Sequence, residues 1–217
     1  MGVTYLITGF SLDRRVLDRL GLPPERFRCA DLIAAEPREK LPHYALRMAD
    51  ALGFSPGDAV GGLSFGGMVA LEIARQCRAS RLLMLASCTH PRFIRPAFRA
   101  SGRLTPWIPD AALHALFKNV PALLRLLGMH TSKNAAFLRE VMASFPAALI
   151  RQLPGMMLDW EGCEPAVPYA ALHCDRDWLI RPPLHLSELT LLPGKSHLLS
   201  VSHAEATRNF LLQREKS

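Results

Sequence analysis

Short apolar runs alternate along the chain with amphipathic stretches, and this alternation predicts a sheet flanked by helices. The apolar runs are typical of buried strands and occupy residues 3–8, 28–33, 58–63, 81–87, 168–173 and 186–192. Helical spacing is found between them, at residues 13–20, 41–52, 65–77 and 204–213. Strands that alternate with helices form α/β folds, so we expect a mostly parallel sheet of about six strands with helices on both sides.

One interval, residues 90–162, breaks this rhythm because it contains no good strand. It holds short amphipathic segments separated by prolines, at residues 111–117, 122–127, 134–144 and 147–153. No flexible linker bounds the interval. We therefore expect a helical cap inserted between the fourth and fifth strands, over a core made of residues 1–89 and 163–217. A separate small helical domain is the alternative.

The composition fits one domain, or one domain with an insertion. Of 217 residues, 49% are hydrophobic and 21% are charged, which supplies ample apolar material for a core. No apolar run is as long as a membrane span. Residues 1–8 have the character of a first strand and lack the basic region of a signal peptide. We expect a cytoplasmic protein.

Charge and cysteine content narrow the possible partners. The formal net charge is +7, but the arginines are dispersed and no nucleic-acid-binding motif accompanies them, so we expect no nucleic-acid partner. A small-molecule or acyl substrate, anionic or bound to an acidic carrier protein, suits such a surface better. The five cysteines show no C-x-x-C spacing, which predicts reduced thiols. No convergent ligand set is visible, so we expect no metal and no cofactor.

A glycine-rich turn, GGLSFGG at residues 61–67, joins the third predicted strand to the next helix. It contains the Gly-x-Ser-x-Gly pattern of a nucleophile elbow, with Ser64 at the centre. Such a turn holds the serine in a strained conformation, and the glycines let strand and helix pack closely. The N–H of Phe65, at the helix N-terminus, is the natural first donor to an oxyanion. A glycine-rich turn with a solvent-exposed serine is the structural alternative.

An activated serine needs a base and an acid that orients it, and in this architecture both follow the serine, each after a later strand. Asp175 and Asp177 follow the fifth predicted strand, and His197 follows the sixth. Parallel strands present their carboxyl ends at one edge of a sheet, so these segments are expected to meet. A helix cap at Asp177 and a surface position for His197 are the alternatives. Three other histidines are expected to be structural or solvent-facing: His90, His173 and His203.

Taken together, these segments resemble the α/β-hydrolase superfamily over nearly the whole chain. The resemblance is carried by Gly9-Phe10 after the first strand, GLSFGG at residues 62–67, DRD at residues 175–177 and GKSH at residues 194–197. Within the superfamily, the chain is similar to small single-domain esterases and thioesterase-like enzymes with a short helical cap. The sequence departs from the full fold in that it begins at the strand before Gly9-Phe10, so we expect a sheet without the first two antiparallel strands.

Site roles follow from this resemblance. It implies Ser64 as nucleophile, His197 as general base and Asp177 as the acid, with Asp175 as the alternative acid. It also implies an oxyanion hole formed by the backbone N–H groups of Phe10 and Phe65. Three positions depart from the usual histidine, glycine and proline of the superfamily: Thr8, Cys174 and Arg181.

These features predict a serine hydrolase that cleaves carboxylic esters or thioesters through an acyl-enzyme. Four aromatic residues are candidates for an apolar substrate pocket, with plain packing as the alternative: Trp107, Phe117, Phe145 and Trp160. Two other functions are compatible with the sequence. The same triad serves carbon–carbon cleavage, lyase or acyl-transfer chemistry, and a hydrolase-like scaffold can bind a ligand without turnover. The complete Ser, His and Asp set argues against the binding scaffold.

Overall fold

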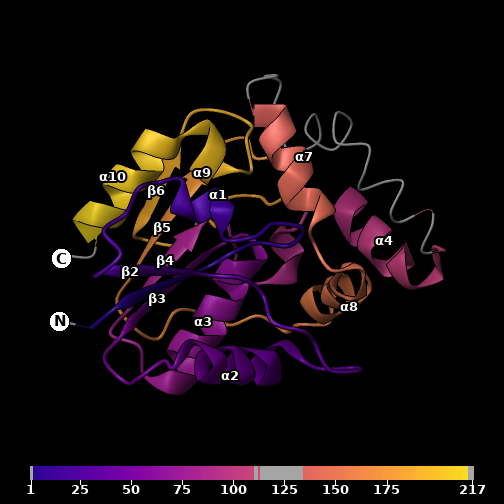
Figure 1. Ribbon diagram of the computed structural model, residues 1–217, viewed down its shortest axis with the longest axis horizontal. Coiled ribbons are helices and arrows are strands. Elements are labelled where there is room, and N and C mark those ends of the chain that lie inside the picture. Colours follow the sequence, from indigo (N-terminus) through magenta and orange to yellow (C-terminus); the bar gives the residue numbers. More distant parts are fainter. Residues whose placement is uncertain (1, 110–111, 113–133, 215–217) are drawn as a thin grey trace.

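A six-stranded parallel sheet runs through the centre of the protein (Figure 1). The structure is a computed structural model that describes residues 2–109, 112 and 134–214. The strands lie in the order β2-β1-β3-β4-β5-β6, and every neighbouring pair is parallel. Their bounds are β1 Thr4–Ile7, β2 Phe27–Ala30, β3 Ala59–Leu63, β4 Arg81–Leu85, β5 Tyr169–Cys174 and β6 Leu189–Leu192. The predicted fold class, an α/β fold with six parallel strands, is confirmed.

Helices cover both faces of this sheet. The described α-helices are α1 Arg15–Asp18, α2 Leu41–Leu52, α3 Phe65–Cys77, α4 Pro96–Leu104, α7 Ala135–Ala143, α8 Ala147–Leu158, α9 Leu199–Ser202 and α10 Ala204–Arg214. Two short 3₁₀ turns, η1 Pro91–Phe93 and η2 Thr105–Trp107, flank α4. The predicted bounds of α2 agree with the structure because Gly53 ends the helix in the left-handed conformation, with φ 66°.

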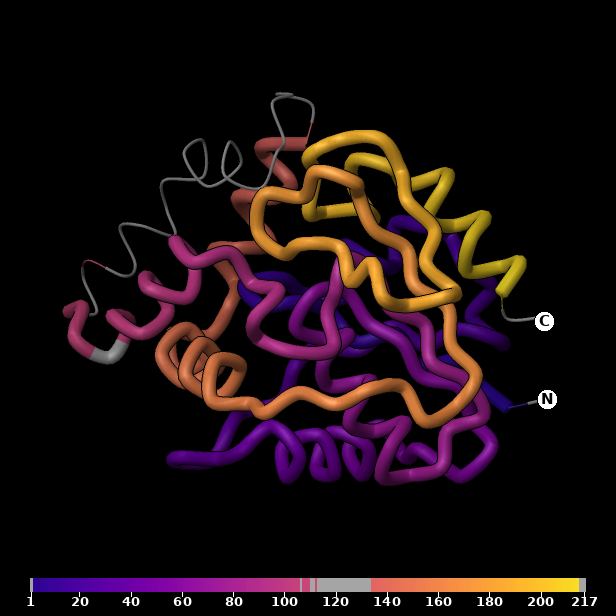
Figure 2. Tube along the Cα trace, turned by 180° about the vertical axis from the view of Figure 1, so that it is seen from behind, coloured from indigo at the N-terminus to yellow at the C-terminus, as the bar shows by residue number. Residues whose placement is uncertain are grey.

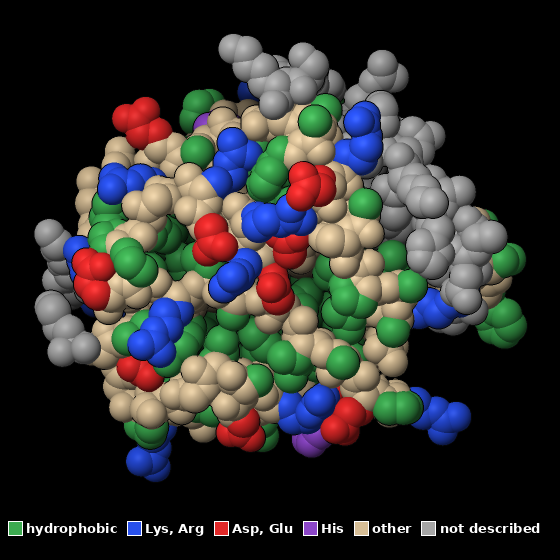
Figure 3. Space-filling model, in the orientation of Figure 1, with side chains coloured by type: hydrophobic (Ala, Val, Ile, Leu, Met, Phe, Trp, Pro, Cys, Tyr) green, Lys and Arg blue, Asp and Glu red, His purple; other side chains and the backbone are tan. Residues whose placement is uncertain are grey.

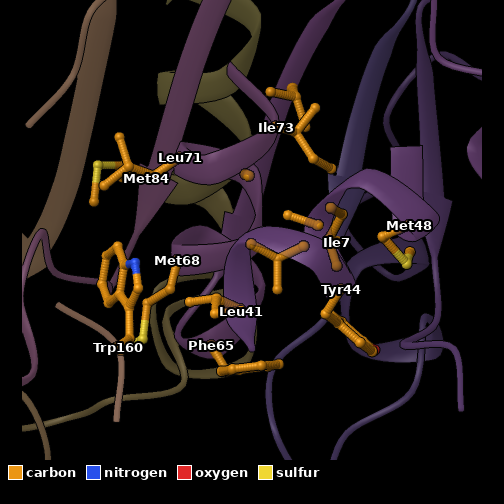
Figure 4. Packing of buried hydrophobic residues seen from close by; sticks show 14 of the residues in the cluster. Ile7, Leu41, Tyr44, Met48, Phe65, Met68, Leu71, Ile73, Met84 and Trp160 are labelled. Carbon is orange, nitrogen blue, oxygen red and sulfur yellow. The ribbon is translucent and has the colours of Figure 1, made fainter. Parts of the chain in front are cut away.

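The alternation of side chains along the strands divides the core in two. Ile7, Val60 and Met84 belong to the cluster that contains residues of α2, α3 and α8, and Figure 4 shows Ile7 and Met84 with side chains of α2 and α3. Leu6 and Leu83 face the opposite cluster, which contains residues of α1, α7, α9 and α10. Successive residues of a strand point to opposite faces, so an almost continuous apolar run such as β4 is buried on both sides.

The segment between β4 and β5 supplies α4, α7 and α8. These helices lie on the side opposite to the two chain ends (Figures 1 and 2). Helix α8 continues past its expected end at residue 153 and contains Pro154, and α4 forms where only proline-interrupted segments were expected. The segments predicted at residues 111–117 and 122–127 lie outside the described residues. The division into core and cap stays a prediction.

Charged side chains of both signs are interspersed on the face shown in Figure 3. Among the described residues, no single helix has the length and apolar character of a membrane span. Helices α7 and α8 pass that test only as a pair, and this pair is bent by 91°.

Candidate active site

Ser64 lies at the sharp turn between β3 and α3. Its backbone has φ 55° and ψ −118°, a region that residues other than glycine rarely adopt. Two contacts hold the turn in place: the Ser64 N–H donates to the Leu85 carbonyl at 2.8 Å, and Gly66 packs so closely on the end of β1 that a Cβ would collide with the Ile7 and Thr8 carbonyl oxygens. A strained backbone held by tight packing is the geometry of a nucleophile elbow.

The Ser64 side chain is joined to His197, which is joined to Asp177. Ser64 Oγ lies 2.7 Å from His197 Nε2, and His197 Nδ1 lies 2.7 Å from Asp177 Oδ2. All three residues are buried, with exposed fractions of 8% for Ser64, 0% for Asp177 and 2% for His197. An ionised carboxylate only accepts hydrogen bonds, so Nδ1 carries the imidazole proton. His197 Nε2 is then free to accept the proton of the Ser64 hydroxyl.

The Asp177 carboxylate is held on both oxygens. Oδ1 accepts the backbone N–H groups of Leu179 at 2.7 Å and Ile180 at 3.1 Å. Burial by itself raises the pKa of Asp177, but the charge of His197 and the hydrogen bonds from His173 and His197 outweigh it and lower the pKa below its usual value. The carboxylate therefore remains ionised beside the imidazole.

Asp175, the alternative acid, has a different environment. Its side chain is 41% exposed and lies 3.6 Å from Arg176 Nε. Its Oδ1 accepts the Gly194 N–H at 2.7 Å, and this hydrogen bond is the main cause of its lowered pKa. The structure thus brings Asp177, and not Asp175, to His197.

The two residues predicted to supply oxyanion donors, Phe65 and Phe10, belong to segments that meet at Ser64. Phe65 is the first residue of α3, and the first N–H groups of a helix have no partner within it. Gly9 runs so close to the elbow that a Cβ there would lie 3.2 Å from Ser64 Cβ, which places the neighbouring Phe10 backbone beside the serine. The Phe10 ring packs edge-on against Phe145, with ring centroids 5.5 Å apart.

Of the four aromatic residues predicted to line the pocket, only Phe145 is placed near the site, through its contact with Phe10. Trp107, the last residue of η2, is 83% exposed, and its assignment to the pocket stays a prediction. Phe117 lies outside the described residues.

Trp160 is also placed elsewhere. Its indole N–H donates to Glu72 Oε1 at 2.7 Å, and the ring lies beside Met68 in the core (Figure 4). It lines a cavity of about 390 Å³ whose other residues are Lys40, Leu41, Pro42, Glu72, Arg75, Asp159, Glu161, Gly162 and Cys163. None of these residues is Ser64, Asp177 or His197, so the assignment of Trp160 to the substrate pocket is corrected to a core position tied to Glu72.

His173 was expected to be structural or solvent-facing, and its contact with Asp177 is the part of this site that sequence reasoning missed. It is 1% exposed, its Nε2 lies 3.2 Å from Asp177 Oδ2, and it shares a hydrogen bond with the Ile180 carbonyl at 3.1 Å. The available signal was its position near the end of β5, four residues before Asp177.

One group of side chains among the described residues has the spacing of metal ligands: Glu36, Glu39 and His43. The Arg47 guanidinium already lies against this group, with Nη1 at 3.1 and 2.9 Å from the two Glu39 carboxylate oxygens. Since a cationic side chain neutralises the buried carboxylate, this group is accounted for as an ion-pair network.

Comparison with known proteins identifies the fold. No protein-family model matches the sequence, and no curated protein matches it. Solved structures do match: a thermophilic esterase from Thermogutta terrifontis has a TM-score of 0.75 at 17% identity, covering 100% of this chain and 92% of that one. An α/β-hydrolase-fold protein from Burkholderia ambifaria has a TM-score of 0.74 at 16% identity, with 98% and 90% covered. The enol-lactonase from Burkholderia xenovorans has a TM-score of 0.71 at 13% identity, with 100% and 92% covered. The chain has the α/β-hydrolase fold.

Proposed function

We propose that the protein is a serine hydrolase that cleaves a carboxylic ester or thioester. One observation carries the proposal: the continuous hydrogen-bonded series from Ser64 Oγ through His197 to Asp177, with both contacts at 2.7 Å. A serine is a weak nucleophile at neutral pH unless a base removes its proton. His197 is in position to do so, and Asp177 keeps it in the required tautomer.

The proposed reaction uses only groups of this chain. His197 Nε2 takes the proton as Ser64 Oγ attacks the carbonyl carbon, and the N–H groups of Phe10 and Phe65 stabilise the oxyanion. His197 then protonates the leaving group, which departs and leaves an acyl-enzyme. Water, activated by the same imidazole, attacks the acyl-enzyme and releases the acid.

The nature of the substrate is inferred from the surroundings of Ser64. Phe10 and Phe145 place an apolar aromatic pair beside the elbow, which favours a hydrophobic acyl group over acetate. The ester-type names of the solved esterase and enol-lactonase that share this fold agree with the proposed bond type.

The test is hydrolysis of a panel of acyl esters and acyl thioesters of increasing chain length. We expect turnover by the wild type, its loss in Ser64→Ala, and unchanged turnover in Ser87→Ala. Ser87 is a matched control because it is also buried and its Oγ has no partner among the described residues. Equal rates for all acyl lengths, or a preference for acetate, would contradict the hydrophobic acyl site. Turnover that survives in Ser64→Ala would contradict the proposed nucleophile.

A further inference from the structure

The turn that carries Asp177 is clamped from several sides. Its Oδ1 accepts two backbone N–H groups, from Leu179 and Ile180. Its backbone carbonyl accepts Nε and Nη2 of Arg95, at 2.9 and 2.8 Å. Ile180 in turn forms an antiparallel bridge with Ile94. These contacts fix the backbone of the turn and one carboxylate oxygen, and leave Oδ2 for the histidines.

His173 reaches this turn from β5. Its Nε2 lies 3.1 Å from the Ile180 carbonyl oxygen and 3.2 Å from Asp177 Oδ2. Both neighbours are acceptors, so Nε2 must carry the proton, and the ring is fixed as the Nε2–H tautomer. A buried N–H between two oxygens joins the end of the turn to its carboxylate.

We propose that His173 is a positioning residue, whose N–H holds the Asp177 carboxylate in the orientation that His197 requires. The inference rests on the proposed function, since Asp177 is taken as the acid of the triad. His173 touches neither Ser64 nor the reacting atoms. It acts on the reaction by limiting the movement of Oδ2, which is the only carboxylate oxygen bound to His197.

Other ionisable side chains near Asp177 do not duplicate this role. Burial raises the pKa of the Cys88 thiol to about 12 and that of the Cys174 thiol to about 11, so both are uncharged at neutral pH. Arg95 binds the backbone carbonyl of Asp177. Among the described residues, the side-chain N–H groups at Oδ2 are those of His197 and His173.

Two substitutions separate this role from simple packing. His173→Met supplies a side chain of similar length that has no N–H, whereas His173→Gln keeps an N–H donor at a similar distance along the side chain. We expect His173→Met to lower kcat about tenfold, the loss of one hydrogen bond to a charged group, with KM within about twofold. We expect His173→Gln to restore kcat to within about threefold of wild type. His203→Leu is the control, because His203 is a neighbouring histidine whose Nδ1 contacts Ser202 Oγ at 2.8 Å.

Nuclear magnetic resonance tests the contact between His173 and Asp177 without any turnover. Long-range ¹H–¹⁵N spectra of the wild type should show His173 as the Nε2–H tautomer. The downfield signal of the His197 Nδ1 proton should move in His173→Met and remain in place in His203→Leu. A His173 with its proton on Nδ1, or a His197 signal and kcat that do not change in His173→Met, would overturn the inference. If His173→Met does not fold, the wild-type tautomer and the His173→Gln kinetics decide. Absence of ester turnover in the wild type would refute the proposed function instead, and the spectra would still test the contact between His173 and Asp177.

Discussion

Replacement of Asp177 by asparagine should disable the site through the tautomer of His197. Oδ1 of Asp177 accepts two backbone N–H groups, at 2.7 and 3.1 Å. An amide NH₂ cannot take that place without facing two donors, so the asparagine carbonyl oxygen must occupy it. The NH₂ then replaces Oδ2 and points at His197 Nδ1, which lies 2.7 Å away. His197 is forced to accept at Nδ1 and to carry its proton on Nε2, toward Ser64.

The expected loss of kcat is large because His197 Nε2 then already carries a proton and cannot accept the proton of the Ser64 hydroxyl. A wrong imidazole tautomer in a serine protease triad lowers kcat by about 10⁴-fold, which corresponds to about 5.5 kcal/mol of activation free energy. We expect a loss of this order for Asp177→Asn. Asp175→Asn is the matched control: its carboxylate is partly exposed and accepts the Gly194 N–H, a contact that an amide oxygen preserves, so we expect kcat within about twofold.

The assay is the steady-state kcat and KM of both variants with an ester that the wild type hydrolyses, after circular dichroism and thermal unfolding have established that each is folded. Retention of more than about a tenth of the wild-type kcat in Asp177→Asn would refute the tautomer argument. A loss in Asp175→Asn that equals the loss in Asp177→Asn would show that the acid is misassigned.

Three further changes test the fold around the site. Gly66→Ala should lower the free energy of unfolding in urea by about 3 kcal/mol or more, because the new methyl collides with backbone carbonyl oxygens of β1; an unchanged midpoint would contradict this packing. Trp160→Phe should cost about 1–3 kcal/mol in the same assay, since it removes the N–H that donates to buried Glu72, and it should leave KM for the ester unchanged. The pKa of Asp177 is lower in the folded protein than in the unfolded chain. Its carboxylate therefore stabilises the fold at pH values above the unfolded-state pKa of about 3.9, and this contribution to stability is lost as the pH falls below that value. Between about pH 6 and pH 3, wild type should therefore lose more stability than Asp177→Asn, and parallel curves would contradict the lowered pKa.

The sheet could be predicted because short stretches of sequence are enough to indicate each strand and the turn that follows it. A strand such as β4 is apolar from Leu82 to Leu85, and the turn after β3 has its own glycine pattern. The beginnings and ends of helices were harder to predict near prolines. The prolines of residues 90–162 were taken as separators between short segments, but Pro96 begins α4, a position where a proline without an N–H costs no hydrogen bond. Pro154 lies buried inside α8, where packing overrides the tendency of proline to end a helix.

Long-range pairing limited what could be inferred about side chains. Trp160 was expected in the substrate pocket, but its partner Glu72 lies 88 residues away and no local pattern connects the two. The difference between Asp175 and Asp177 depends on a turn in which the N–H groups of Leu179 and Ile180 bind the Asp177 carboxylate. The contact between His173 and Asp177 was missed for a similar reason: the position of a histidine in an apolar strand suggests that it is buried, but it does not show which carboxylate it meets.

The most direct test of the central claim is intact-mass analysis after treatment with a reactive fluorophosphonate. This reagent forms a covalent adduct with a serine that a neighbouring base has activated. We expect one adduct on the wild type and none on Ser64→Ala or His197→Ala. A folded wild type that forms no adduct, or an adduct that persists in Ser64→Ala, would show that Ser64 is not the nucleophile that its contact with His197 implies.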